Sequence, residues 1–174
     1  KFGWISVSEQ NNQILSISLE KSKNKGNSNI LKKLKKMLKD YLKVTDMSDL
    51  RFWIKIHPAT SEKYLKILFE GDWSDEFTII NDSASKCIPK CNIMISGMSS
   101  ICLETMSLGI PVIFITNLSG ISFSPIPEEI KQILWRKCNT SKDIKDAIEY
   151  YRNRSYSEIN EHKAIGLKIK EKYI

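Results

Sequence analysis

The chain has 174 residues, of which 41% are hydrophobic and 27% are charged. This length predicts one domain with a buried core, and no apolar run reaches the roughly 18 residues of a membrane-spanning helix. The four cysteines form no CxxC pair and have no histidine at metal-ligand spacing. This pattern disfavours a disulfide framework and a zinc site and favours a reducing, cytoplasmic compartment. Because the chain begins at Lys1 without an initiator methionine, we expect it to be part of a longer protein.

A lysine-rich segment carries much of the formal net charge of +7, with nine lysines and one acidic residue between Lys21 and Lys43. Apolar residues recur there at helical spacing, which predicts an amphipathic helix over residues 28–43 with a solvated lysine face. The segment has no arginine and only one aromatic residue, Tyr41, so we expect no nucleic-acid partner. Attraction of the lysines to an anionic substrate, or to lipid headgroups at the inner face of a membrane, stays open as an alternative.

Strand and helix patterns alternate along the rest of the chain. Strands are predicted at residues 13–20, 50–56, 77–80 and 93–95, and helical segments at 60–69 and 83–88. A helix then runs from Ser99 or Ser100 to Gly109, and Pro111 begins another strand. Residues 117–127 are a Ser- and Pro-rich loop, a candidate ligand-covering element. Residues 128–134 begin a helix or lead into a last strand at 133–138, and helices follow at about 140–151 and 157–173.

This alternation predicts an α/β fold: a Rossmann-like, three-layer α/β/α domain with a mainly parallel sheet. Ligands of such sheets bind beyond the carboxyl ends of the strands. His57 follows one predicted strand, and the segment that begins at Ser96 follows another. We therefore expect both to lie at the same edge of the sheet.

The segment at residues 92–116, NIMISGMSSICLETMSLGIPVIFIT, is the strongest site candidate. Free amides and the helix dipole at a helix start favour a phosphate, and small hydroxyl residues add donors. The residues that would provide this phosphate site are Ser96, Gly97, Ser99 and Ser100. Glu104 follows Ser100 by four residues, on the same helix face, where it would meet sugar hydroxyls. Each feature alone is more typical of an ordinary N-cap or a solvated carboxylate, so the interpretation depends on their convergence.

His57 is one of two histidines in the chain. Oriented by the fixed backbone of Pro58, its imidazole would be placed to donate to, or protonate, a phosphate oxygen. Lys55 lies two residues earlier and points the same way along the strand. A partly buried histidine at a strand end is the alternative for His57. His162 lies in a charged C-terminal helix, where we expect it to be solvated.

Taken together, three short motifs resemble the C-terminal, donor-binding half of GT-B glycosyltransferases. They are the HP pair His57-Pro58, the paired serines Ser99-Ser100, and the Gly-x-Pro-Val-Ile segment from Gly109 to Ile113. The resemblance is to bacterial surface-polysaccharide and sialyltransferase-like enzymes, and it spans roughly residues 51–151. In those enzymes the first two motifs contact the nucleotide phosphate, and the glutamate at the place of Glu104 commonly binds the ribose.

The resemblance implies transfer of a sugar, or a polyol-phosphate-like group, from a nucleotide donor to a glycan or lipid-linked acceptor. It favours a CMP- or CDP-linked donor over a UDP-linked one, requires no metal, and makes His57 the catalytic candidate. It also implies that residues 1–156 are a Rossmann-like donor-binding domain and that the helix at 157–174 packs on a missing N-terminal half. A GT-B-like nucleotide-sugar epimerase, or a non-catalytic module that binds an anionic ligand or a membrane surface, are the alternatives.

Overall fold

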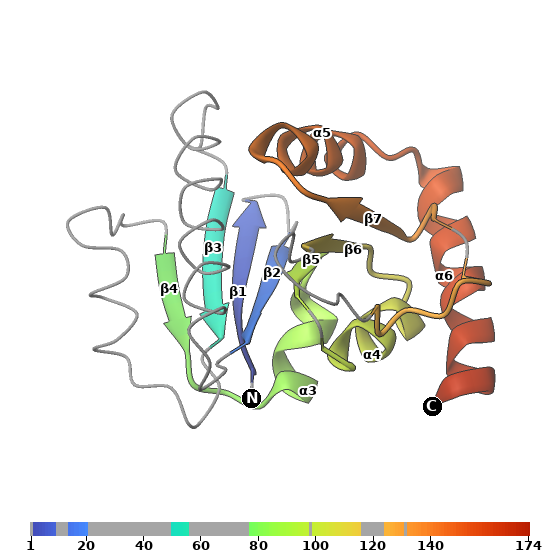
Figure 1. Ribbon diagram of the computed structural model, residues 1–174, viewed down its shortest axis with the longest axis horizontal. Coiled ribbons are helices and arrows are strands. Elements are labelled where there is room, and N and C mark those ends of the chain that lie inside the picture. The colour runs from blue at the N-terminus through green and yellow to red at the C-terminus, as the bar shows by residue number, and fades with distance from the viewer. Residues whose placement is uncertain are drawn as a thin grey trace.

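The computed structural model describes residues 2–9, 14–20, 50–55, 77–97, 99–115, 124–130 and 132–174 (Figure 1). The predicted helices at 28–43 and 60–69, the HP pair at residues 57 and 58, and most of the predicted loop at 117–127 lie outside these segments. The described strands are β1 Phe2–Glu9, β2 Ile14–Glu20, β3 Leu50–Lys55, β4 Phe77–Ile80, β5 Ile93–Ser96, β6 Val112–Ile115 and β7 Trp135–Cys138. The described helices are α3 Ala84–Cys87, the 3-10 helix η1 Ile88–Lys90, α4 Ile101–Ser107, α5 Ser141–Arg152 and α6 Tyr156–Tyr173.

The described strands pair in the order β4-β3-β1-β2-β5-β6-β7. Strand β1 is antiparallel to β2 and β3, whereas the pairs β3–β4, β2–β5, β5–β6 and β6–β7 are parallel. Ile17 of β2 is in register with Ile5 of β1 and Ile95 of β5, and Ile5 and Ile95 also pair. All strands except β1 therefore run in one direction, and the fold is α/β with a mainly parallel sheet.

Strand β1 was not predicted, although Ile5 and Val7 alternate with Ser6 and Ser8 in a strand pattern. The other predicted strands that fall on described residues are present. Residues 128–134 were predicted either to begin a helix or to lead into a strand at 133–138. The structure has the strand, β7, and turns among the described residues before it.

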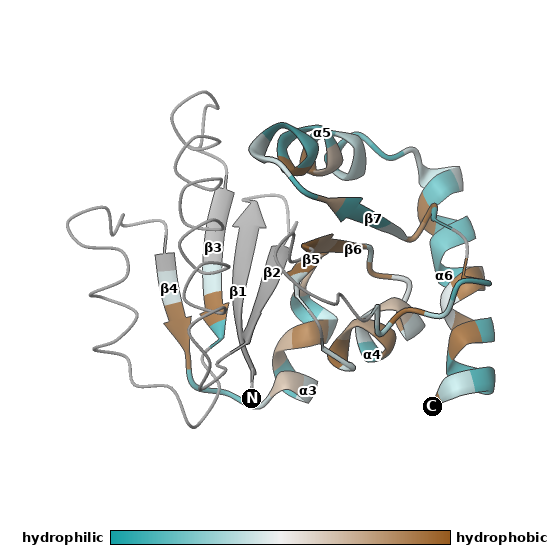
Figure 2. Ribbon diagram, viewed as in Figure 1, coloured by the Kyte–Doolittle hydropathy of each residue, from teal (hydrophilic) through white to brown (hydrophobic). Residues whose placement is uncertain are grey.

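Strands β5 and β6 lie at the centre of the core, because every one of their residues is buried. Met94, Val112 and Phe114 alternate along these strands and join a cluster with Met106 of α4 and Ile169 of α6. The residues between them, such as Ile113, are buried outside that cluster. Figure 1 shows α5 above β6 and β7 and α4 below them, and Figure 2 shows the hydrophobic character of β5 and β6. Burial on both faces explains why these strands are continuous apolar runs.

Helices α5 and α6 both begin with a capping box. The Thr140 hydroxyl accepts from the backbone of Asp143, whose carboxylate accepts from the backbone of Thr140. Ser155 and Glu158 make the same reciprocal pair at the start of α6. This arrangement satisfies amide groups that have no partner inside a helix. Helix α6 therefore begins one residue earlier than predicted.

One face of α6 packs against α4 and the turn that follows it. Gly166 is buried in this contact, and Gly109, with φ of +73°, ends α4 in the left-handed conformation that favours glycine. On α6, Tyr156 and Leu167 remain 79% and 61% exposed. The idea that this helix also contacts a missing half stays a prediction.

Candidate functional site

The predicted phosphate-binding turn lies at the carboxyl end of β5 and leads into α4. We call it the serine turn, after Ser96, Ser99 and Ser100. Ser96 is fully buried, and its hydroxyl donates to the carbonyl of Gly97 at 3.2 Å. Ser99 is also buried, and its hydroxyl accepts from the backbone amide of Ile101 at 3.4 Å. In this conformation both hydroxyls make contacts inside the turn, so they stabilise its shape.

Ser100 and Glu104 are the solvent-exposed members of the predicted set. Ser100 is the N-cap residue of α4, and its side chain makes no capping hydrogen bond. Glu104 lies one helical turn further on the same face, because residues four apart on a helix are neighbours. A ligand at the carboxyl end of β5 would therefore contact both the exposed hydroxyl of Ser100 and the exposed carboxylate of Glu104.

The floor of this turn is formed by Cys102, which is fully buried. Its thiol donates to the Gly97 carbonyl at 3.8 Å. Burial raises the pKa of this thiol to about 11, although a hydrogen bond with Ser96 favours the thiolate. The thiol is therefore protonated at neutral pH, and it acts as a small hydrophobic residue beneath the turn.

The other half of the predicted site depends on β3, which leads toward residue 57. Because β3 and β5 point the same way, their carboxyl ends lie at the same edge of the sheet. Strands β1 and β2 lie between them in the sheet order. However, Ile5 of β1 also pairs directly with Ile95, beside Ser96 at the carboxyl end of β5. At that end β1 alone separates the two strand tips, and two strand spacings correspond to about 10 Å. The position of His57 lies outside the described residues.

Lys55 was predicted to support His57 at the phosphate. Its ammonium group instead donates to the backbone carbonyl of Asn81 at 3.2 Å. Asn81 follows β4, which lies on the side of β3 opposite to β5. In this arrangement the Lys55 charge is directed away from the serine turn.

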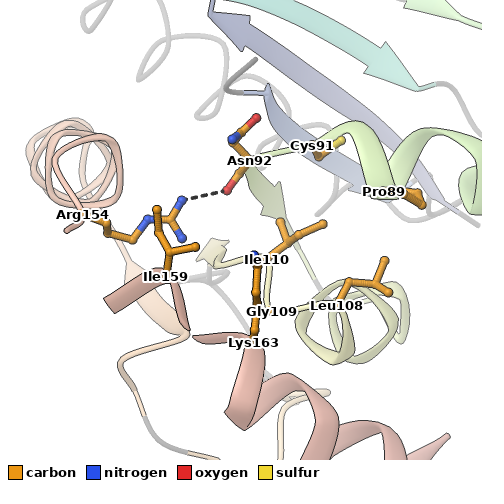
Figure 3. A pocket seen from close by; sticks show the side chains of 9 residues that line it. All are labelled: Pro89, Cys91, Asn92, Leu108, Gly109, Ile110, Arg154, Ile159 and Lys163. Carbon is orange, nitrogen blue, oxygen red and sulfur yellow. Dashed lines mark hydrogen bonds between the residues drawn. The ribbon is translucent and has the colours of Figure 1, made fainter. Parts of the chain in front are cut away.

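A pocket that the sequence analysis missed lies at the amino end of β5, the end opposite to Ser96. Its volume is about 360 Å³. Its two basic residues are Arg154 and Lys163 (Figure 3). The segments that form it are far apart in the sequence, and no local motif marks any of them.

His162 lies behind this pocket and is fully buried, so the expectation of a solvated side chain was wrong. Its Nδ1 is 3.0 Å from Nη1 of Arg154, and because arginine only donates, Nδ1 is the acceptor. Burial and, to a smaller extent, the neighbouring Arg154 lower the pKa of His162 to about 4, against weaker opposing effects of Glu158 and the Ile133 backbone. The imidazole is therefore neutral near pH 7.

Comparisons with protein-family models, with curated proteins and with solved structures found no match for this chain. Among the described residues, no helix combines the length and apolar character needed to cross a membrane. Within the same segments, no group of three or more His, Cys, Asp or Glu side chains is arranged to hold a metal ion.

Proposed function

We propose that this chain is the donor-binding half of a GT-B-type glycosyltransferase, with a Rossmann-like, three-layer α/β/α domain. The proposal depends mainly on one observation, the segment in which β5, the serine turn, α4 and β6 follow one another. It presents exposed Ser100 and Glu104 one helical turn apart at the carboxyl edge of parallel strands. Nucleotides bind at this edge of α/β sheets, with phosphate at a helix start.

In the proposed complex, the turn from Ser96 to Ser100 meets the donor phosphate and Glu104 accepts from the ribose hydroxyls. Ser100 is the hydroxyl in reach of a ligand, whereas buried Ser96 and Ser99 hold the turn. The phosphate gathers negative charge as its bond to the sugar breaks. Donors placed where that charge develops lower the barrier, and removing one costs about 2–4 kcal/mol in the transition state.

His57 is proposed to stabilise or protonate the leaving phosphate from the tip of β3. Because β1 pairs with both β3 and β5 near their carboxyl ends, the donor phosphate would lie between the two tips, over the strand that separates them. An acceptor glycan or lipid-linked saccharide would then approach from a second half of the enzyme. The lysine-rich segment at 28–43 is proposed to bring the enzyme to an anionic membrane surface.

Calorimetric titration of the chain with CMP, CDP, UDP and GDP tests this proposal. We expect CMP or CDP to bind most tightly, and Ser100→Ala and Glu104→Gln each to raise the Kd about tenfold through loss of a hydrogen bond to a charged group. Matched controls are Ser157→Ala and Glu161→Gln, which change exposed residues of α6. They should leave the Kd unchanged.

A different outcome would favour the non-catalytic alternative. If His57→Ala and Ser100→Ala leave nucleotide binding unchanged, while lysine-to-glutamate changes at residues 32–39 abolish it, the glycosyltransferase proposal is wrong. Release and rebinding of the free nucleotide without net sugar transfer would instead indicate an epimerase.

A further inference from the structure

The pocket at the amino end of β5 has an unusual charge arrangement. Three segments form it: the turn before β5, the turn between α4 and β6, and the α5–α6 connection with the start of α6 (Figure 3). The lining residues are Pro89, Cys91, Asn92, Leu108, Gly109, Ile110, Arg154, Ile159 and Lys163. This lining has two basic side chains and no acidic one.

Arg154 is held rigidly at one side of the pocket. Its Nε donates to the Tyr151 carbonyl at 2.6 Å, its Nη2 to the Asn92 carbonyl at 3.3 Å, and its Nη1 to Nδ1 of His162 at 3.0 Å. All three acceptors are neutral. An arginine has five N–H groups, and the contacts with described residues use three of them.

No described carboxylate neutralises the Arg154 charge by an ion pair. The nearest acidic influence is Glu158, whose carboxylate accepts from the backbone and hydroxyl of Ser155. Arg154 is half-buried, and this burial lowers the pKa of its guanidinium group. A fully buried cation is normally paired with an anion, and partial burial favours such pairing to a smaller degree. The structure therefore has a preorganised guanidinium whose counter-ion is not supplied by its described surroundings.

The remaining walls indicate what kind of anion fits. Leu108, Ile110 and Ile159 give the pocket an apolar side. Lys163 is exposed on α6, beside Gly109, and adds a second positive charge. A volume of about 360 Å³ is at the small end of the range for ligand pockets.

We propose that this pocket binds a small organic anion, with a phosphate or carboxylate group on Arg154 and Lys163 and an apolar body against Leu108, Ile110 and Ile159. Arginine is suited to this role because its planar N–H groups match two oxygen atoms of such an anion. The pocket and the proposed donor site lie at opposite ends of β5. Occupation of this pocket is therefore independent of the proposed function.

Titration of the ¹⁵N-labelled chain with phenyl phosphate tests the proposal, and benzyl alcohol is the neutral control. Phenyl phosphate should shift the amide resonances of Gly109 and Ile110 saturably, and Ser100→Ala should leave that saturation curve unchanged. Benzyl alcohol should bind at least about tenfold more weakly, because it lacks the charge that Arg154 pairs with. Equal binding of the two compounds, or no saturable shift at Gly109, would overturn the proposal.

Two lysine variants of α6 distinguish specific binding in this pocket from non-specific attraction of the anion to the positive charge of the chain. Lys163→Gln should weaken phenyl phosphate binding about fivefold to tenfold. Lys168→Gln removes the same charge from another exposed position of α6 and should have no effect. Equal losses in the two variants would contradict a defined site. Both variants keep Arg154 and its contacts with His162, so they test the ligand without removing a structural arginine.

Discussion

The backbones of Gly109 and Gly166 approach so closely that a Cβ atom on Gly166 would lie 2.6 Å from the Gly109 nitrogen. The same Cβ atom would lie 2.7 Å from the carbonyl oxygen of Met106. These are backbone atoms, so they cannot turn aside as a flexible side chain does. The contact between α4 and α6 therefore depends on the absence of a side chain at residue 166.

We expect Gly166→Ala to destabilise the fold by about 1–3 kcal/mol, because overpacking outweighs the gain in helix propensity. Urea unfolding followed by circular dichroism measures this change. Leu167→Ala is the control, since Leu167 is 61% exposed on the same helix, and it should change stability by less than about 0.5 kcal/mol. A Gly166→Ala variant as stable as the unsubstituted chain would contradict the close contact.

The neutral state of buried His162 predicts a pH dependence of stability. Its pKa is about 4 in the folded chain, against an ordinary value of 6.5. Between these values the unfolded chain binds more protons, so the free energy of unfolding falls as the pH decreases from about 6.5 to about 4. This one group contributes a slope of at most about 1.4 kcal/mol per pH unit. Urea unfolding at several pH values measures it.

The variant His162→Gln provides the matching comparison, because an amide oxygen can still accept from Arg154 but does not titrate. We expect its stability to vary less between pH 7 and pH 4.5 than that of the unsubstituted chain. Identical slopes would show that His162 does not titrate abnormally. A proton NMR titration gives the same answer directly, since the chain has only two histidines.

All four cysteine side chains are buried. Burial raises the pKa of Cys102 to about 11 and that of Cys138 to about 12. Because the thiolate is the reactive form, we expect slow reaction of the native chain with a disulfide reagent at pH 8 and fast reaction after unfolding. A Ser157→Cys variant adds one exposed thiol and should react at once. Rapid modification of the unsubstituted native chain would contradict this burial.

The capping box at the start of α6 predicts a further stability effect. Ser155→Ala removes the hydroxyl that accepts from the Glu158 amide and should cost about 1 kcal/mol. Ser157→Ala, two residues into the helix, should be close to neutral. Thermal unfolding of the two variants side by side checks this, and equal effects would argue against the cap.

Local patterns predicted much of the described fold. The apolar run at 93–95, Gly109 and Pro111 predicted the β5–α4–β6 unit, and the helical pattern from about residue 140 predicted α5, because apolar runs, turn residues and helix periodicity are local properties. Strand β1 was missed although its alternation is visible. Its position between β2 and β3 depends on pairing with a strand far away in the sequence, which no local pattern predicts.

The candidate site was predictable only in part. The sequence placed Ser100 and Glu104 one turn apart on a helix, which the structure confirms. It did not reveal that Ser96 and Ser99 are buried, since burial depends on how α4 packs against β5. It also missed Arg154 and the buried state of His162. Both result from α5, α6 and the turn before β5 meeting in space, and charge and spacing within one helix contain no information about that contact.

The proposed function requires that the serine turn after β5 and the imidazole of residue 57 bind one donor phosphate. The most direct measurement is a crystal structure of the chain with CMP. We expect the phosphate within hydrogen-bonding distance of Ser100 and of His57, with the ribose at Glu104. A nucleotide bound elsewhere, or a phosphate at Ser100 with the His57 side chain turned away, would contradict it.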